Sequence, residues 1–181
     1  MLEAYGWYLE DSEWLGAVPD EVVIASDRLP KYYDIAEELI RRGGAYVCRC
    51  DQATFKATKD AATPCPHRDQ SPEENMELWK EMMNGKLGPG EAVLRVKTDI
   101  AHKDPALRDW AAFRIVAADH PRVGEKYRVW PLLDFESGVE DHLLGVTHII
   151  RGKDLMDSER RQRYLYDHMG WEYPTTIHWG R

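Results

Sequence analysis

Hydrophobic residues in the first fifty positions alternate between helical spacing and short continuous runs. Leu2, Tyr5, Leu9 and Trp14 share one face of a predicted helix over residues 2–15, which ends at a glycine. A second helical pattern covers residues 33–40. The apolar runs at residues 21–26 and 45–50 predict buried strands. Helix, strand, helix and strand in succession indicate a parallel α/β sheet.

The middle of the chain is more polar and less regular. Residues 48–69 have no clear period. Residues 71–74, Ser-Pro-Glu-Glu, form a capping box with proline at the first helical position. The helix that follows is expected to stop at Gly85. Strands are predicted at residues 92–98 and around residues 113–116.

The α/β pattern returns in the last third of the chain. The predicted elements there are a strand at 127–133, a helix at 135–144, a strand at 146–151, a helix capped by Asp157 and Ser158 that runs to residue 169, and an extended segment at 175–181. We therefore expect an α/β fold whose sheet is interrupted by an insertion of about residues 45–126.

The amino-acid composition restricts the class of protein to which this chain can belong. The 181 residues, 43% of them hydrophobic, suffice for one large domain, or for one domain with a smaller inserted module. The net charge of −8 argues against a protein that wraps nucleic acid by bulk electrostatics. Any nucleic-acid contact would be local. The available basic clusters, which could equally be solvated helix faces, are Arg41 and Arg42 with Arg49, and Arg160 and Arg161 with Arg163.

Neither a membrane span nor a secretory signal is evident. No apolar run approaches the roughly 20 residues that a membrane-spanning helix needs, and the N-terminus is acidic and amphipathic. We expect a soluble, cytoplasmic protein with no membrane partner. In that reducing compartment an odd number of cysteines argues against a disulfide framework.

All of the cysteines lie in one short polar segment. Cys48 and Cys50 are separated by one residue, and so are Cys65 and His67. Thiolate and imidazole ligands in two such pairs are typical of a closed, tetrahedral, structural zinc site. The alternative is three buried cysteines and a surface histidine. Because Cys65 stands between two prolines in a polar loop, a poor place for a core residue, the pattern favours zinc.

Arg151 follows the predicted strand at residues 146–151. Open α/β sheets bind ligands at the carboxyl ends of their parallel strands. A guanidinium there is suited to bidentate pairing with a carboxylate. From spacing alone, an ordinary ion pair with Asp154 or Glu140 is the alternative.

Three stretches resemble a known family. "GVEDHLLGVTHIIRGKDLMDSERRQRYLYDHMGW" closely resembles the second half of the class I catalytic domain of glutamyl-tRNA synthetases, in the archaeal form akin to glutaminyl-tRNA synthetases. "SDRLPKYYDIAEELIRRGGAYVCRC" resembles the stretch that leads into the family's acceptor-stem-binding insertion, and "GEAVLRVKTDIAHKDPALRDWAAFRI" resembles the interior of that insertion. The resemblance covers essentially the whole chain in order.

The resemblance implies a partial Rossmann-type parallel sheet interrupted by a zinc-containing, acceptor-stem-binding insertion. Residues 1–44 would belong to the Rossmann-type catalytic domain, residues 45–126 to the insertion with its zinc knuckle, and residues 127–181 to the second half of the catalytic domain. The implied activity is activation of glutamate by ATP, with Mg²⁺, and transfer of the glutamyl group to the 3′ end of tRNA. The cysteine and histidine pairs match the knuckle that many members have.

The resemblance also implies roles for individual residues. Arg151 falls where the glutamate-specific members hold the side-chain carboxylate of the substrate. Ser137 would face the amino-acid pocket, and the loop from Gly152 would bring Asp154 and Asp157 near ATP and the acceptor stem. Leu133 stands where the family usually has a tyrosine that contacts the amino acid. Trp130 or Phe135 could supply the aromatic wall instead.

The two class I signatures, "HIGH" and "KMSKS", are absent from the sequence. The resemblance therefore implies a central piece of a longer synthetase, and we expect this piece to have no synthetase activity by itself, since the transition-state charge would be unsupported. Two alternatives stay open. One is a piece of a glutaminyl-tRNA synthetase, against which Arg151 argues, and the other is a free-standing, zinc-stabilised binding module without catalysis.

Overall fold

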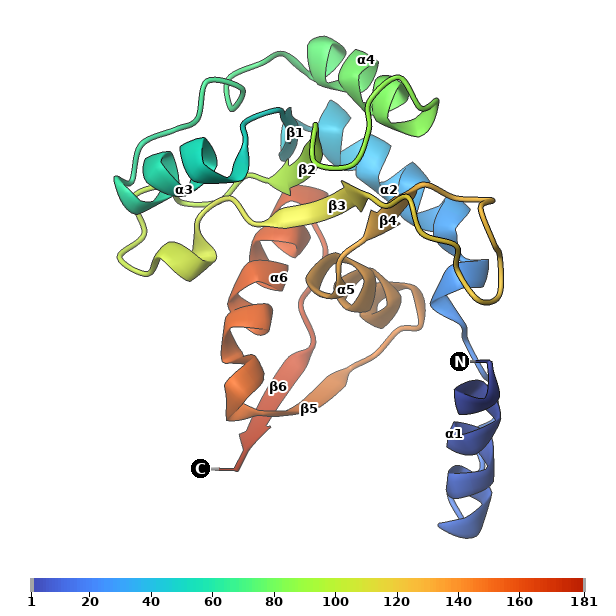
Figure 1. Ribbon diagram of the computed structural model, residues 1–181. Coiled ribbons are helices and arrows are strands. Elements are labelled where there is room, and N and C mark those ends of the chain that lie inside the picture. The colour runs from blue at the N-terminus through green and yellow to red at the C-terminus, as the bar shows by residue number, and fades with distance from the viewer. Residues whose placement is uncertain (1, 181) are drawn as a thin grey trace.

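The computed structural model describes residues 2–180 (Figure 1). The helices are α1 (Glu3–Trp14), α2 (Leu29–Arg41), α3 (Gln52–Asp60), α4 (Pro72–Met83), α5 (Leu133–Leu143) and α6 (Met156–Met169), with short 3-10 turns η1 (Ala25–Asp27), η2 (Pro105–Leu107) and η3 (Lys153–Leu155). The strands are β1 (Ala45–Cys48), β2 (Val93–Val96), β3 (Ala111–Ile115), β4 (Val129–Pro131), β5 (His148–Gly152) and β6 (Thr175–Trp179).

The strands form two sheets. One has the order β1-β2-β3-β4 with antiparallel neighbours, so that Tyr46 lies opposite Arg95 and Phe113 opposite Pro131. The other is a parallel pair, β5 and β6, in which Arg151 lies opposite His178. The α/β class and the presence of a parallel sheet are confirmed.

Alternation along β1 divides the interior into two clusters. Side chains of successive strand residues point to opposite faces. Val47 therefore lies in the main core with α2 and α4, whereas Tyr46 and Cys48 join Phe55 of α3 in a second, smaller cluster. Figure 1 shows α3 on the other side of β1 from α2. The second cluster holds two of the predicted metal ligands.

The main core is rich in aromatic residues. The ring of Phe113 on β3 packs edge-on against Trp79 of α4 at 5.2 Å and against Phe135 of α5 at 4.7 Å between ring centroids. All three are fully buried. Tyr33 of α2 joins them and donates its hydroxyl hydrogen to the carbonyl oxygen of Val129 at 2.7 Å. These contacts attach α2, α4 and α5 to the sheet, and edge-to-face pairs of this kind add about 1 kcal/mol each beyond simple burial.

Two predictions about strands are wrong. Residues 21–26 form no strand: they are irregular and then enter η1, and Val22, Val23 and Ile24 line a cleft beside α1. A continuous apolar run signals partial burial but does not guarantee a strand partner. The strand at residues 45–50 was expected to continue the parallel pattern, but β1 pairs antiparallel with β2. Because β1 is buried on both faces, its continuous apolar run does not exclude an antiparallel partner.

Helix positions agree better with the sequence. The predicted helices near residues 2–15, 33–40, 72–84, 135–144 and 157–169 are all present. The segment at residues 48–69, expected to be irregular, contains α3, capped by the Asp51 side chain. Asp157 and Ser158 do not cap α6, because the helix begins at Met156 and no side chain caps it.

The first helix, α1, buries no side chain. Trp14 is 84% exposed and Leu2 is 57% exposed, so the apolar face that predicted this helix is open to solvent. In Figure 1 the helix extends away from the sheets. Within residues 2–180, each helix is too short or too polar to cross a lipid bilayer.

The capping box predicted at Ser71 is confirmed and gives a first test. The Ser71 hydroxyl accepts a hydrogen bond from the backbone N–H of Glu74 at 3.1 Å, and the Glu74 carboxylate accepts one from the N–H of Ser71 at 2.8 Å. Ser71→Ala is expected to lower the free energy of unfolding by about 1 kcal/mol. Urea unfolding followed by circular dichroism measures this. Ser158→Ala is the matched control, since Ser158 lies within α6 and caps nothing; equal losses in both variants would contradict the role of Ser71.

Candidate functional site

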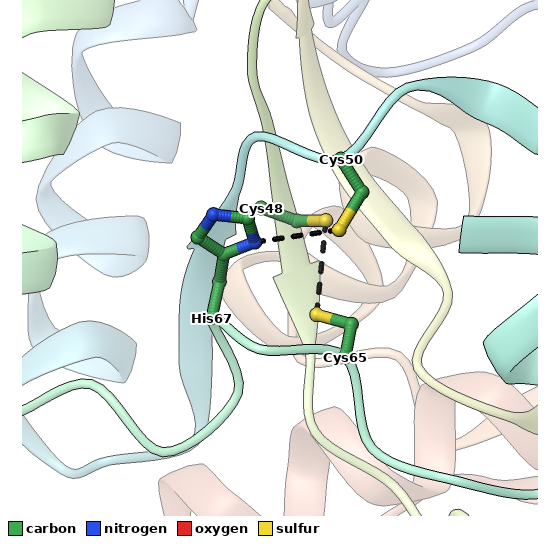
Figure 2. A group of neighbouring side chains, drawn as sticks. All are labelled: Cys48, Cys50, Cys65 and His67. Carbon is green, nitrogen blue, oxygen red and sulfur yellow. Dashed lines mark hydrogen bonds between the residues drawn. The ribbon is translucent and has the colours of Figure 1, made fainter. Parts of the chain in front are cut away.

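The four predicted metal ligands lie together in the structure. Cys48 ends β1 and Cys50 follows it, whereas Cys65 and His67 come from the loop between α3 and α4. Their ligand atoms all lie within 4.8 Å of one another. Figure 2 shows the three sulfur atoms and the imidazole ring converging on one point. The strand thus supplies one pair of ligands and the loop supplies the other.

The distances fit a tetrahedral site. Zn–S bonds of about 2.3 Å and Zn–N bonds of about 2.0 Å place tetrahedral ligands about 3.5–3.8 Å apart. The Sγ atoms of Cys48 and Cys65 are 3.9 Å apart, and Cys50 Sγ is 3.4 Å from Nδ1 of His67. Three thiols and one imidazole are the donor set that zinc favours in structural sites. The donor set and these two distances therefore fit a zinc site.

The protonation of the cysteines is uneven. The hydrogen bond between Cys48 and Cys65 lowers the pKa of Cys48 to about 7, with further help from the cation of Arg95. The same bond, together with burial, raises the pKa of Cys65 to about 12. Burial also raises the pKa of Cys50. Metals bind cysteine as the thiolate, so a metal bound to these residues would displace protons and would bind more tightly as the pH rises.

A second group of polar residues surrounds Arg151 at the end of β5. The half-buried Arg151 donates from Nη1 to Oε1 of Gln162 at 3.0 Å. Gln162, on α6, is fully buried. Its Oε1 also accepts from the hydroxyl of Tyr173 at 2.7 Å, and its Nε2 donates to Ser137 Oγ at 2.8 Å and to the carbonyl oxygen of Asp134 at 3.1 Å. Gln162 thus connects Arg151 and Ser137, for which the family resemblance implies a shared pocket.

No ion pair holds the Arg151 guanidinium within residues 2–180. Of the two carboxylates considered from the sequence, Glu140 pairs with Arg28 at 2.6 Å, and Asp154 is exposed. The single side-chain hydrogen bond that Arg151 makes in this part of the chain is the one to Gln162. Its remaining N–H groups can therefore receive an external carboxylate.

The other predicted pocket residues differ in position. Leu133, at the start of α5, is 65% exposed. Of the two aromatic residues that could replace its expected tyrosine, Phe135 is fully buried in the core, whereas Trp130 lines a cleft of about 760 Å³ beside α1. Trp130 is thus the aromatic residue that the structure leaves accessible.

Asp154 and Asp157 follow Arg151 in the chain, in η3 and at the start of α6. Asp154 is exposed in η3, and Asp157 is half-buried in the first turn of α6. Asp157 accepts a hydrogen bond from Arg160 at 3.4 Å. Both belong to the Arg151 region and not to the metal cluster. The structure thus brings the candidate residues together as two separate groups, one at the end of β1 and one at the end of β5 (Figure 1).

Sequence reasoning missed Gln162, Tyr173 and the buried Asp109. A signal for Gln162 was available. The buried residues of α6 are Gln162, Leu165, Tyr166 and Met169, which is helical spacing with one polar member. A polar residue on a buried helical face requires hydrogen-bond partners, which makes it a candidate for a structured site. Asp109 gave no such signal, because its partners come from distant parts of the chain.

Comparison with known proteins gives a consistent result. The sequence profile of the family "tRNA synthetases class I (E and Q), catalytic domain" matches residues 3–180. A glutamate–tRNA ligase of Methanothrix thermoacetophila is 74% identical over all of this chain and 32% of its own length. Those of Archaeoglobus fulgidus and Pyrococcus horikoshii are 62% and 56% identical over 100% and 98% of this chain. The chain spans about a third of the length of the curated relatives it matches.

Solved structures agree with the fold. A glutamate tRNA ligase from Elizabethkingia meningosepticum, solved in complex with its amino acid, superimposes with a TM-score of 0.60 at 21% identity, over 98% of this chain and 39% of that one. The corresponding synthetase of Elizabethkingia anophelis gives a TM-score of 0.60 at 20% identity, over 98% of this chain and 40% of that one.

Proposed function

Because the chain belongs to the family of class I tRNA synthetase catalytic domains specific for glutamate and glutamine, we propose that it is part of a glutamate–tRNA ligase. The relatives that carry this name are 56–74% identical over essentially the whole chain. In the proposed reaction, the α-carboxylate of glutamate attacks the α-phosphorus of ATP and pyrophosphate leaves. The glutamyl group of the adenylate then passes to a hydroxyl of the 3′-terminal ribose of tRNA, and AMP leaves.

The contacts of Arg151 are the main structural support for glutamate as the proposed substrate. A half-buried guanidinium held from one side by Gln162 presents its other N–H groups to a ligand. A substrate carboxylate would accept two parallel hydrogen bonds and neutralise the charge. The amide of glutamine would satisfy fewer of these donors and would leave the cation unpaired. Arg151 therefore favours glutamate–tRNA ligase over the glutaminyl enzyme.

The remaining assignments extend the proposal along the chain. Ser137, bound to Gln162, and Leu133 would form part of the amino-acid pocket, and Asp154 and Asp157 would lie near ATP, its Mg²⁺ and the acceptor stem. Residues 45–126 would bind the acceptor end of tRNA. They would form an insertion between the two parts of the catalytic domain, residues 1–44 and residues 127–181. Within residues 45–126, β1, β2 and β3 form a continuous antiparallel unit, and the same sheet continues into β4 of the last part.

The metal centre would stabilise the base of that insertion. Cys48, Cys50, Cys65 and His67 would hold a zinc ion with all four positions filled by protein, as in structural sites. When bound, zinc would cross-link the end of β1 to the loop after α3. These four residues leave no position for a reacting water, so we assign them no part in the chemistry. The proposed place of action is the cytoplasm, where tRNA is charged.

Aminoacylation tests the proposal. A protein of the relatives' full length that contains this chain is expected to charge tRNA with glutamate, with kcat/KM for glutamate on the order of 1000-fold above that for glutamine. Radiolabelled amino acid retained on purified tRNA measures both substrates. Equal or preferential charging with glutamine would contradict the proposal, and a protein that charges neither would favour the binding-module alternative.

A further inference from the structure

Asp109 is a charged residue with no contact with solvent. Its side chain is 0% exposed, and its backbone adopts a left-handed conformation with φ of +35°. Burial of an unpaired carboxylate would be strongly unfavourable, and the left-handed conformation adds a further cost of about 1 kcal/mol. A buried carboxylate on a left-handed backbone is therefore stable only if neighbouring groups form hydrogen bonds or ion pairs with it. Asp109 lies just before β3, close to the second hydrophobic cluster.

Three donors from separate parts of the chain converge on the Asp109 carboxylate. The hydroxyl of Tyr46 donates to Oδ2 at 3.0 Å, and Nε of Arg68 donates to the same oxygen at 2.8 Å. The backbone N–H of Thr98 donates to Oδ1 at 2.9 Å. In return, the N–H of Asp109 donates to Oγ1 of Thr98 at 2.7 Å. The carboxylate therefore ties β1, the loop after α3 and the segment after β2 to one point.

Two of these donors lead directly to the metal ligands. Tyr46 is two residues before Cys48 on the same face of β1, and its hydroxyl oxygen lies 3.6 Å from Sγ of Cys65. Arg68 follows His67 in the chain, and its Nη2 also donates to the carbonyl oxygen of Thr98 at 2.8 Å. Both ligands of the loop, Cys65 and His67, are thus connected to Asp109 through a single intervening side chain.

This connection matters because the two ligand pairs have different supports. Cys48 is fixed by the ladder between β1 and β2. Cys65 and His67 lie in a loop with no strand or helix. Its local contacts include two turn hydrogen bonds, from the N–H of Arg68 to the carbonyl oxygen of Cys65 at 3.1 Å and from the N–H of Gln70 to that of His67 at 3.4 Å. The position of the loop against the strand must be set by bonds that cross between them, and Asp109 receives two such bonds.

We propose that Asp109 is a positioning residue for a soft divalent cation: through Tyr46 and Arg68 it fixes Cys65 and His67 at the distance from Cys48 and Cys50 that the metal requires. The inference rests on the proposed metal centre. In the arrangement shown, the single hydrogen of the Tyr46 hydroxyl goes to Asp109, and the thiol of Cys65 donates to the tyrosine oxygen. A metal ion bound to the Cys65 thiolate would take the place of the thiol proton. Asp109 would then keep its bonds from Tyr46, Arg68 and Thr98, so its connection to the loop would persist in the metal-bound state.

Zinc affinity tests this role in the full 181-residue chain. Asp109→Asn keeps the shape of the side chain but removes the charge, and Tyr46→Phe removes one hydroxyl. The matched control is Asp69→Asn, which removes the same charge from an exposed residue beside the ligand loop. Competition with a chromophoric chelator gives the Zn²⁺ dissociation constant, and the visible absorption of the Co²⁺ derivative reports the ligand geometry.

Loss of an outer partner of a metal ligand typically weakens binding about 10- to 100-fold. That loss is expected for Asp109→Asn, together with an altered Co²⁺ spectrum, and a loss of at least about threefold is expected for Tyr46→Phe. Asp69→Asn should bind as the unaltered chain does. A purely structural role for Asp109 would lower the melting temperature but leave the spectrum and affinity of the folded protein unchanged, and that result would overturn the proposal.

Two further outcomes are decisive. If Asp109→Asn does not fold, Tyr46→Phe decides, and an unchanged zinc affinity in that variant overturns the proposal. If the unaltered chain takes up neither Zn²⁺ nor Co²⁺, the metal centre itself is refuted and the inference with it. The aminoacylation test is independent of both, so failure here is distinguishable from failure of the proposed ligase activity.

Discussion

Replacing Cys65 by serine is expected to lower the zinc affinity of the chain by about 100- to 1000-fold. The free energy of zinc binding at structural sites with four ligands is about 10–16 kcal/mol at neutral pH. The loss of one ligand therefore reduces this binding free energy by about 3–4 kcal/mol. Cys65 is buried and bridges the loop to Cys48, hence the serine hydroxyl would be a poor substitute in both charge and reach. Metal content by mass spectrometry and chelator competition measure the effect.

The same change is expected to loosen residues 49–70, which follow β1. Between Arg49 and Gln70 the buried hydrophobic side chains are Phe55 and Cys65, too little apolar surface to fold this segment by itself. Hydrogen exchange should accelerate there in Cys65→Ser, and in the unaltered chain after chelation, while β3 and α6 stay protected. His148→Ala is the control, since His148 is exposed and outside the cluster. Zinc below about 0.2 equivalents in the purified chain, against the one expected for a closed site, would leave the cysteines as core residues.

Local signals predicted much of the secondary structure. The capping box at Ser71 and the glycine after α6, Gly170 with φ of +71°, act through a few neighbouring residues, and both mark real helix boundaries. The one-residue spacing of the cysteine and histidine pairs also identified side chains that lie together. Such features can be inferred from one stretch of sequence because their physics is local.

Features that depend on distant residues were not predictable in the same way. The direction of β1 is set by its pairing with β2, more than forty residues away, and the apolar pattern of β1 is compatible with either direction. The roles of Gln162 and Asp109 depend on partners from three separate segments each. The charge and size of these residues gave no indication of their neighbours, and only the folded arrangement reveals them.

Replacing Arg151 by glutamine in a full-length protein that contains this chain is expected to reduce kcat/KM for glutamate by about 100- to 1000-fold. Removing one partner of a hydrogen-bonded, partly buried charge pair costs about 2–5 kcal/mol. Glutamine at this position keeps hydrogen-bonding groups but cannot neutralise the substrate carboxylate. Arg151→Lys keeps the charge without the planar pair of donors, so a smaller loss is expected.

The loss of kcat/KM in Arg151→Gln should affect only the substrate whose side chain is negatively charged. Use of glutamine by the Arg151→Gln variant is expected to change little, since no cation then remains to be left unpaired. Lys80→Gln is the control for loss of a surface charge. Lys80 is exposed on α4 and pairs with Glu77 on the same helix at 2.8 Å, so its loss should leave both substrates as they are.

The ratio of kcat/KM for glutamate to kcat/KM for glutamine in tRNA aminoacylation, measured side by side for the unaltered enzyme and Arg151→Gln, tests the central claim most directly. If Arg151 selects the substrate carboxylate, this ratio falls by two orders of magnitude or more, to roughly that expected of a pocket without charge. If both substrates lose activity equally and the ratio is unchanged, Arg151 only supports the fold, and the assignment of glutamate specificity to this part of the chain is contradicted.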